Sequence, residues 1–381
     1  MVKSSAMNRY KYILMLCFSI TGLVKGQTIF EQNYYVSNLN SFQFFNPELS
    51  SLLSFPSKWE DQQIQFRWNG HFYQGEYLSG HLSIRNRFFS GFQWENDLFD
   101  FKKALESSSL HFNSLDEKKI GIHHQIDRLY GQWEKGNWNI RWGRQRINWG
   151  IQNYWNSHDL FNQTDFFDFD YLERPGADAL RIQYFKNNNS SIEWAMNQDI
   201  QAGLLNFNLK KYDFQILAGK YFNDYSIGLG WAGQIKDAGF KGEFASFSNF
   251  NTSEYSWLGS ISIDYSFISG LYLSAGCLYN SMVETFNPLA LFSLDISAKN
   301  PMPFQYNFLY QINYPVHPLI QVGTAVIHDG ELDFIFINPQ IIYSISSSID
   351  LMISSQNTWV KLSEKLKSIN QILFTRLQLN F

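Results

Sequence analysis

Among the last ten residues of the chain, polar and apolar side chains alternate from Arg376 up to the final position. One face of this strand carries Leu373, Thr375, Leu377, Leu379 and Phe381. The opposite face carries Arg376, Gln378 and Asn380. A strand of this kind lies with one side against an apolar medium and the other in water. It fits a strand of a membrane barrel or an edge strand of a soluble β-sandwich.

The N-terminal residues have the pattern of a secretory signal peptide. A basic start is followed by an apolar run over 13–24, which is too short for a membrane-spanning helix, and by small residues suited to cleavage. We therefore predict a signal peptide over 1–26 and Gln27 as the first mature residue. Cys277 is then the one cysteine of the mature chain, so no internal disulfide is expected.

The composition narrows the class of protein. Aromatic residues make up 18% of the chain, yet charged residues make up 17% and the mean hydropathy is negative, at −0.27. This combination is typical of a barrel whose strands turn rings toward lipid and polar groups toward water. The net charge of −4 gives no reason to expect a nucleic-acid partner.

Alternation recurs in internal segments such as 255–267 and 304–314. In 225–235 the polar face consists almost wholly of Gly, Ser and Ala. These segments are about ten residues long, the length of a tilted strand that crosses a bilayer, and turn-formers such as those at 186–189 separate them. In hydrocarbon only a closed barrel satisfies the backbone polar groups of such strands.

We therefore predict an all-β fold, a transmembrane antiparallel β-barrel with an even number of strands, about 14 within a range of roughly 12 to 18. The expected organisation is an N-terminal segment over 27–57, which either holds one strand or lies inside the lumen, and a barrel over 58–381, with long loops at 92–119, 149–178 and 280–303. A terminal strand that ends in Phe381 resembles those of Gram-negative outer-membrane barrels. This resemblance implies an outer-membrane location, contact with lipid, and recognition of the C-terminal strand by the barrel-assembly machinery.

The segment 149–178 is dense with rings and acidic groups, among them Trp155, Asp165, Asp168, Asp170 and Glu173. Because exposing so many rings on the surface is unfavourable, we predict that this loop folds into the barrel and narrows it. The alternative is a solvated outer loop.

The strand before this loop carries Arg141, Arg144 and Arg146. On strict alternation the last two would face lipid, which costs about 2 to 4 kcal/mol each near the midplane. Either a bulge at Gly143 turns all three inward, or this end of the strand lies in the membrane interface. We favour the bulge, with which the arginines would face the acidic loop and select solutes by charge. The alternative is that they pair with acidic groups of neighbouring strands.

The residues from Gly143 to Ile147, the Trp-rich loop and Asp178 to Arg181 together resemble a strand, loop and strand of the alginate-export family and related porin-like barrels. The resemblance covers 141–184 and implies an outer-membrane channel with an arginine-rich lumen. It adds Arg174 and Arg181 to the candidate lumen residues. The dense acidic groups of the loop depart from an all-cationic conduit.

The leading functional prediction is a porin-like channel for passive diffusion of small polar solutes. Carbohydrates are candidate solutes because Trp and Tyr side chains stack on sugar rings. The second prediction is an export or surface-assembly barrel for a polysaccharide, and the third is an outer-membrane lipid-modifying enzyme. The sequence leaves open whether identical barrels associate into an oligomer.

Catalysis is not expected. His123 and His124 lie near Asp127, and His158 lies beside Asp159, but no local sequence signature places a nucleophile next to either group. No cofactor and no metal are expected either. The acidic groups at 165–173 lack the glycine and the ligand spacing of a calcium loop.

Overall fold

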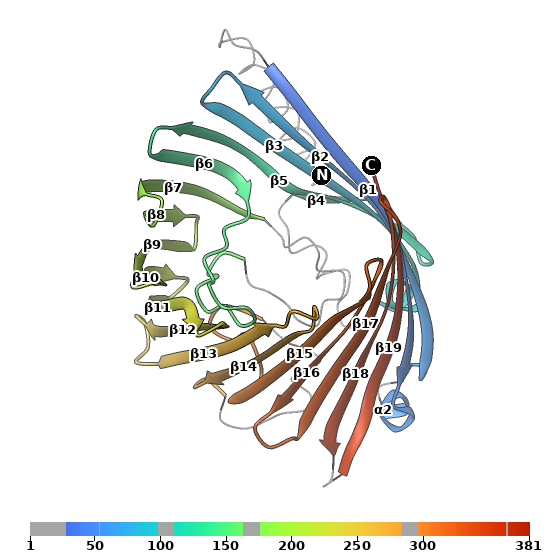
Figure 1. Ribbon diagram of the computed structural model, residues 1–381. Coiled ribbons are helices and arrows are strands. Elements are labelled where there is room, and N and C mark those ends of the chain that lie inside the picture. Colours follow the sequence, from blue (N-terminus) through green and yellow to red (C-terminus); the bar gives the residue numbers. More distant parts are fainter. Residues whose placement is uncertain (1–27, 53, 98–109, 163–175, 284–295, 363–364) are drawn as a thin grey trace.

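The computed structural model is a closed antiparallel β-barrel with a segment of chain inside it (Figure 1). The structure describes residues 28–52, 54–97, 110–162, 176–283, 296–362 and 365–381. The predicted signal peptide lies outside these residues.

The described residues form nineteen strands and two short helices. In chain order these are β1 Thr28–Phe45, α2 Pro47–Leu52, β2 Lys58–Gln74, β3 Leu78–Gly91, α3 Phe92–Asn96, β4 His111–Asp116, β5 Ile120–Lys135, β6 Trp138–Gln145, β7 Ala177–Asn187, β8 Ser190–Met196, β9 Ile200–Leu209, β10 Tyr212–Tyr221, β11 Asp224–Ile235, β12 Ala238–Asn249, β13 Tyr255–Ser266, β14 Tyr272–Asn280, β15 Tyr306–His317, β16 Ile320–Asp329, β17 Phe334–Ser346, β18 Ile349–Leu362 and β19 Lys365–Asn380.

Eighteen of these strands form the wall, because β3 pairs directly with β5 and β1 pairs with both β2 and β19. The remaining strand, β4, pairs only with the 121–125 part of β5. It covers an edge of β5 that β6 leaves open, since β6 pairs with β5 only from Leu129 onward.

The expected count of 14 strands is therefore wrong, although the fold class and the even number hold. One added strand is β1, which lies within the N-terminal segment 27–57. Other strands were not counted because the tight turns that join them have no clear sequence signal. Lys210 and Lys211 join β9 to β10 with φ of 52° and 72°, a left-handed turn that lysine seldom forms and that carries no glycine, proline or asparagine signal.

The two ends of the barrel differ. The longest connections, from β1 to β2, β3 to β5, β6 to β7 and β14 to β15, all leave the wall at one end. At the other end every connection is a turn of two to five residues, such as 75–77, 210–211 and 347–348, and the start of β1 and the end of β19 lie there too. This asymmetry is that of outer-membrane barrels, in which the long loops face outward and the short turns face the periplasm.

Alternate side chains of the wall form an apolar outer belt. On β11, Tyr225 and Ile227 are both 62% exposed, whereas Ser226 between them is buried. Other strands repeat this pattern with Ile261, Ile263, Tyr310, Ile312, Ile341 and Tyr343. Exposed apolar surface in water is unfavourable by about 25 cal/mol per Å². The belt therefore faces lipid, and the strands span the outer membrane.

Neither helix of the described ranges is long and apolar enough to cross a bilayer.

The barrel closes between its first and last strands. β1 and β19 pair from Tyr35 with Asn380 to Phe45 with Asn370. Beyond the end of β19, Phe381 and Tyr34 exchange backbone hydrogen bonds of 2.9 and 3.3 Å, and their rings stack at 5.0 Å. The C-terminal alternation seen in the sequence therefore belongs to the strand that closes the wall.

Candidate functional site

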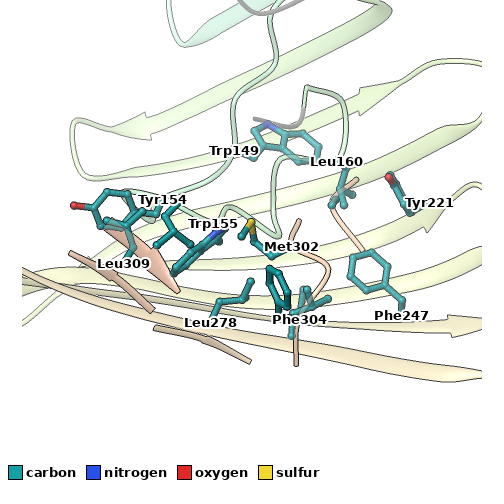
Figure 2. Packing of buried hydrophobic residues seen from close by; sticks show 14 of the residues in the cluster. Trp149, Tyr154, Trp155, Leu160, Tyr221, Phe247, Leu278, Met302, Phe304 and Leu309 are labelled. Atoms are coloured by element: carbon teal, nitrogen blue, oxygen red, sulfur yellow. The ribbon is translucent and has the colours of Figure 1, made fainter. Parts of the chain in front are cut away.

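The connection from β6 to β7 enters the barrel, and its described part, residues 146–162, is called the inner loop here (Figure 1). Its apolar side chains Trp149, Tyr154, Trp155 and Leu160 are buried. They belong to one cluster with wall residues such as Leu278 and with Phe304 from the connection before β15 (Figure 2). The rings that would be unfavourable on the surface are thus packed inside the barrel.

One buried carboxylate on β12 holds the middle of the inner loop. Glu243 accepts hydrogen bonds from the backbone N–H groups of Ile151, Gln152 and His158, the last two at 2.8 and 3.2 Å. It also accepts one from the hydroxyl of Ser157 at 3.4 Å. Glu243 is 1% exposed, so these four donors stand in for water around a buried carboxylate.

Two further carboxylates fix the start of the inner loop. Asp159, within the loop, accepts the N–H groups of Trp149 and Gly150, both at 2.6 Å. Glu193, on β8, accepts the indole N–H of Trp149 and forms a paired contact with Arg181 at 2.6 and 2.8 Å. The loop is therefore tied both to itself and to the wall.

The wall strands beneath the inner loop carry small side chains, and the loop fills the space that they leave. A Cβ atom on Gly228 would lie 2.4 Å from Nε2 of His158, and one on Gly276 would lie 2.9 Å from Cδ2 of Tyr154. Farther along, the Tyr154 hydroxyl lies 2.5 Å from Oγ of Ser274. Gly228 and Gly230, on the small polar face of 225–235, leave the space that His158 of the loop occupies.

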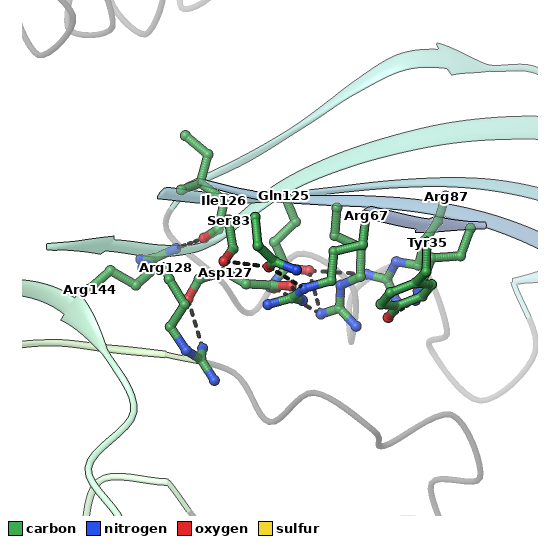
Figure 3. Close-up of polar contacts among 12 residues, drawn as sticks. Tyr35, Arg67, Ser83, Arg87, Gln125, Ile126, Asp127, Arg128 and Arg144 are labelled. Carbon is green, nitrogen blue, oxygen red and sulfur yellow. Dashed lines mark hydrogen bonds and ion pairs between the residues drawn. The ribbon is translucent and has the colours of Figure 1, made fainter. Parts of the chain in front are cut away.

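A second set of side chains lines the opposite part of the wall, on β2, β3 and β5 (Figure 3). Asp127 is fully buried and contacts both Arg67 and Arg85, the latter at 3.0 Å. Arg87 donates to Gln125 at 3.1 Å. One carboxylate thus lies among several guanidinium groups.

An irregular position in β5 brings the charges of this set together. Ser83 pairs with Arg128 and Ile84 pairs with Ile126, so Asp127 has no partner in the register. Such a bulge lets Asp127 and Arg128 turn to the same side of the sheet. The sequence analysis did not predict this bulge. The two adjacent charges of Asp127 and Arg128, in the middle of an otherwise alternating strand, were the signal that could have indicated it.

The three arginines predicted to act together lie in different surroundings. Arg141 faces the lumen, where it donates to Gln132 at 2.6 and 3.0 Å and lies over the Tyr130 ring at 4.5 Å. Arg146 is exposed and donates to Asn148 at 2.9 Å.

Arg144 is turned into the wall. It donates to both carboxylate oxygens of Asp178 on β7, at 2.7 and 2.8 Å, and to the carbonyl of Ile126 at 3.2 Å. That carbonyl lies on the edge of β5 between the stretches paired with β4 and β6. Arg144 therefore fills a gap in the strand pairing and pairs with an acid of a neighbouring strand.

Gly143 has φ of 111°, and a Cβ there would lie 2.3 Å from the carbonyl oxygen of Leu129. Its pairing with β5 and β7 shows no shift of register, so the expected bulge is absent, and the deviation stays within the glycine backbone.

Of the remaining predicted site residues, Trp155 is buried against the wall and Arg181 pairs with Glu193. Asp165, Asp168, Asp170, Glu173 and Arg174 lie outside the described residues. Their place in a constriction stays a prediction.

His158 of the inner loop is occupied by structural contacts, with Gln215 and with the carbonyl of Phe244, both at 3.2 Å. Among the described residues no three His, Cys, Asp or Glu side chains gather in a way that would hold a metal ion.

The closed wall, the apolar belt, the uneven ends and the inward loop define a porin-like outer-membrane barrel. Solved structures with a similar fold include Pseudomonas aeruginosa OccK5 (OpdH), P. aeruginosa OpdQ and Acinetobacter baumannii OccAB3. Their TM-scores are 0.56, 0.57 and 0.58, at 10%, 10% and 9% sequence identity. Each alignment covers 92% of this chain and 98%, 98% and 99% of the respective structure. At these identities the likeness concerns the fold.

No protein-family profile matches the sequence, and the search of curated proteins found no match. The resemblance of 141–184 to the alginate-export family accordingly stays a prediction.

Proposed function

We propose that this protein is a passive channel for small polar solutes across the outer membrane. A barrel of this strand number is too wide for wall side chains to fill, and barrels of 16 to 18 strands leave an aqueous channel. The inner loop lies against one side of this space, held by buried carboxylates. In this position the loop narrows the lumen. The described residues form no separate domain large enough to plug it.

The observation that carries the proposal is the polar character of the opposite wall. The strands β2, β3, β5 and β6 that form it carry Arg144, which is paired with Asp178, and five further arginines: Arg67, Arg85, Arg87, Arg128 and Arg141. The central acid among them is Asp127, whereas Asp61 and Glu134 lie near the strand ends. An excess of positive charge along one side of a narrowed pore favours solutes with a negative charge or a strong dipole.

The support for carbohydrate as the solute is weaker than the sequence indicated. Trp149, Tyr154 and Trp155 are buried against the wall, so their ring faces are not available for stacking on a sugar. Sugars remain candidates only as small polar molecules.

Liposome swelling tests the proposal. Vesicles that contain the refolded chain should swell in small neutral and anionic solutes, and anions should enter faster than cations of equal size. Swelling equal to that of empty vesicles would contradict a passive channel and favour the export or surface-assembly alternative. We propose no catalytic activity; release of fatty acid from the vesicle lipid would contradict this part.

A further inference from the structure

Two histidines lie directly opposite each other on the lumen face of the wall. His71 on β2 pairs in register with His81 on β3, and their Nδ1 atoms are 3.0 Å apart. Both side chains are half-buried. They lie close to the turn at 75–77, and therefore at the end of the barrel that carries the short turns.

A chain of hydrogen bonds fixes the tautomer of His81. The hydroxyl of Ser83 donates to Oδ1 of Asn69 at 2.7 Å, so its oxygen is left to accept from Nε2–H of His81 at 2.5 Å. Asn69 is itself oriented, since Oδ1 also accepts from Arg67 at 2.9 Å and Nδ2 donates to Asn33 at 2.8 Å. Nδ1 of His81 consequently presents its lone pair to His71.

We propose that His71 and His81 form a binding site for a divalent transition-metal ion of the class Cu²⁺, Ni²⁺ and Zn²⁺. Neutral imidazole nitrogen is a preferred ligand for these ions. Metal–nitrogen bonds of about 2.0 to 2.1 Å place two nitrogens about 2.9 Å apart at a right angle and about 3.3 Å apart at a tetrahedral angle. The observed separation of 3.0 Å lies between these values.

Binding requires a small rearrangement of protons. In the metal-free pair Nδ1–H of His71 donates to Nδ1 of His81. When a metal ion takes its place, the His71 proton moves to Nε2, so both rings stay neutral and each offers Nδ1 to the metal. The hydrogen bond from His81 to Ser83 supports this ring through its other nitrogen, as is usual for metal-bound histidines. Water completes the coordination, because both rings are partly exposed.

The surrounding charges set the strength of the site. Arg67, Arg128 and Arg141 repel a cation at His81. Asp127 offsets the charge of Arg67, and Tyr130 stacks on His81 at 5.3 Å. Two ligands in this field bind more weakly than a site with three or four protein ligands, and they favour Cu²⁺ over Zn²⁺.

A second adjacent histidine pair provides the control. The rings of His111 and His123 are stacked at 5.7 Å with 12° between their planes, so their lone pairs do not converge on one point. Nδ1 of His123 already lies 3.3 Å from a guanidinium nitrogen of Arg87.

The test is titration of the refolded full-length barrel with Cu²⁺ and with Zn²⁺, followed by calorimetry and, for copper, by electron paramagnetic resonance. We expect one bound ion, two nitrogen ligands in the copper spectrum, and tighter binding of copper than of zinc. His71→Gln and His81→Gln should each weaken zinc binding at least tenfold, whereas His111→Gln should leave it unchanged. Ser83→Ala keeps both ligands and should weaken binding severalfold.

Each variant is first checked for the heat-dependent gel mobility of a folded barrel, so a loss of binding is not confused with misfolding. Binding of equal strength in His71→Gln would overturn the proposal. So would an absence of binding to the folded wild-type chain, or a loss that follows His111→Gln instead. These measurements do not depend on whether the barrel conducts.

Discussion

Arginines that look equivalent in the sequence have different roles in the wall. Arg141 lies in the lumen against Tyr130 and Gln132, whereas Arg144 is buried with Asp178 and the carbonyl of Ile126. The difference comes from the pairing of β5, which β4 and β6 share along one edge. No sequence pattern within 138–146 indicates that β4 and β6 share one edge of β5.

The lumen arginines are expected to control charge selectivity. The double variant Arg87→Gln with Arg141→Gln removes two half-buried positive charges from the wall formed by β2, β3, β5 and β6. The reversal potential across a salt gradient should then shift toward cation selectivity. Lys186→Gln, an exposed charge at the end of β7, is the matched control and should leave the reversal potential unchanged. An equal shift in both proteins would assign the selectivity to net charge alone.

Arg144 is expected to affect stability and to leave selectivity unchanged. Arg144→Gln removes a paired contact to Asp178, whose side chain is 53% exposed, and leaves the carbonyl of Ile126 with a weaker partner. We expect a loss of about 1 to 3 kcal/mol in unfolding free energy. Urea unfolding in detergent measures this loss. A changed reversal potential with unchanged stability would place Arg144 in the ion path.

The inner loop and the wall strands beneath it are complementary in shape. The alternation of β11, with small groups on one face, predicted the strand correctly but not the reason for the small groups. That reason is the loop, which lies far away in sequence and occupies the space above Gly228 and Gly276. Such contacts join segments that are far apart in the chain, so no local sequence pattern predicts them.

Added volume beneath the inner loop should displace it. Gly228→Ala places a methyl group 2.4 Å from Nε2 of His158, a buried ring held at both nitrogens. We expect a changed single-channel conductance. Gly259→Ala on β13 is the control, because no atom lies within 4 Å of its new Cβ. Equal conductance in Gly228→Ala and the wild type would mean that the loop position does not set the pore width.

The anchor of the inner loop should set its rigidity. Glu243→Gln replaces a carboxylate that accepts four hydrogen bonds with an amide that has one acceptor oxygen. We expect larger current fluctuations in single-channel recordings, with the barrel still folded. Glu254→Gln, in the exposed connection before β13, should record like the wild type. A quiet trace from Glu243→Gln would show that the ring cluster alone holds the loop.

The class of fold could be predicted from the sequence, because lipid on one side of the wall and water on the other impose an alternation of apolar and polar residues along the strands. Tyr225 to Trp231 and Arg376 to Phe381 carry that pattern. The number of strands depended instead on turns such as Lys210–Lys211 and on the pairing of β1 with β19, which the local pattern does not encode.

The candidate site was predictable only in part. The inward course of the loop followed from its many rings, and Trp149 and Trp155 are indeed buried inside the barrel. The bulge at Asp127 and the cluster of Arg67 and Arg85 around it were missed, because they depend on the register between β3 and β5.

The most direct test of a passive channel is the single-channel conductance of the refolded chain from Gln27 to Phe381 in a planar bilayer. The structure predicts stable steps of current, proportional to voltage, with a preference for anions over cations. A chain that is folded and inserted but carries no current would contradict an open lumen and a passive channel.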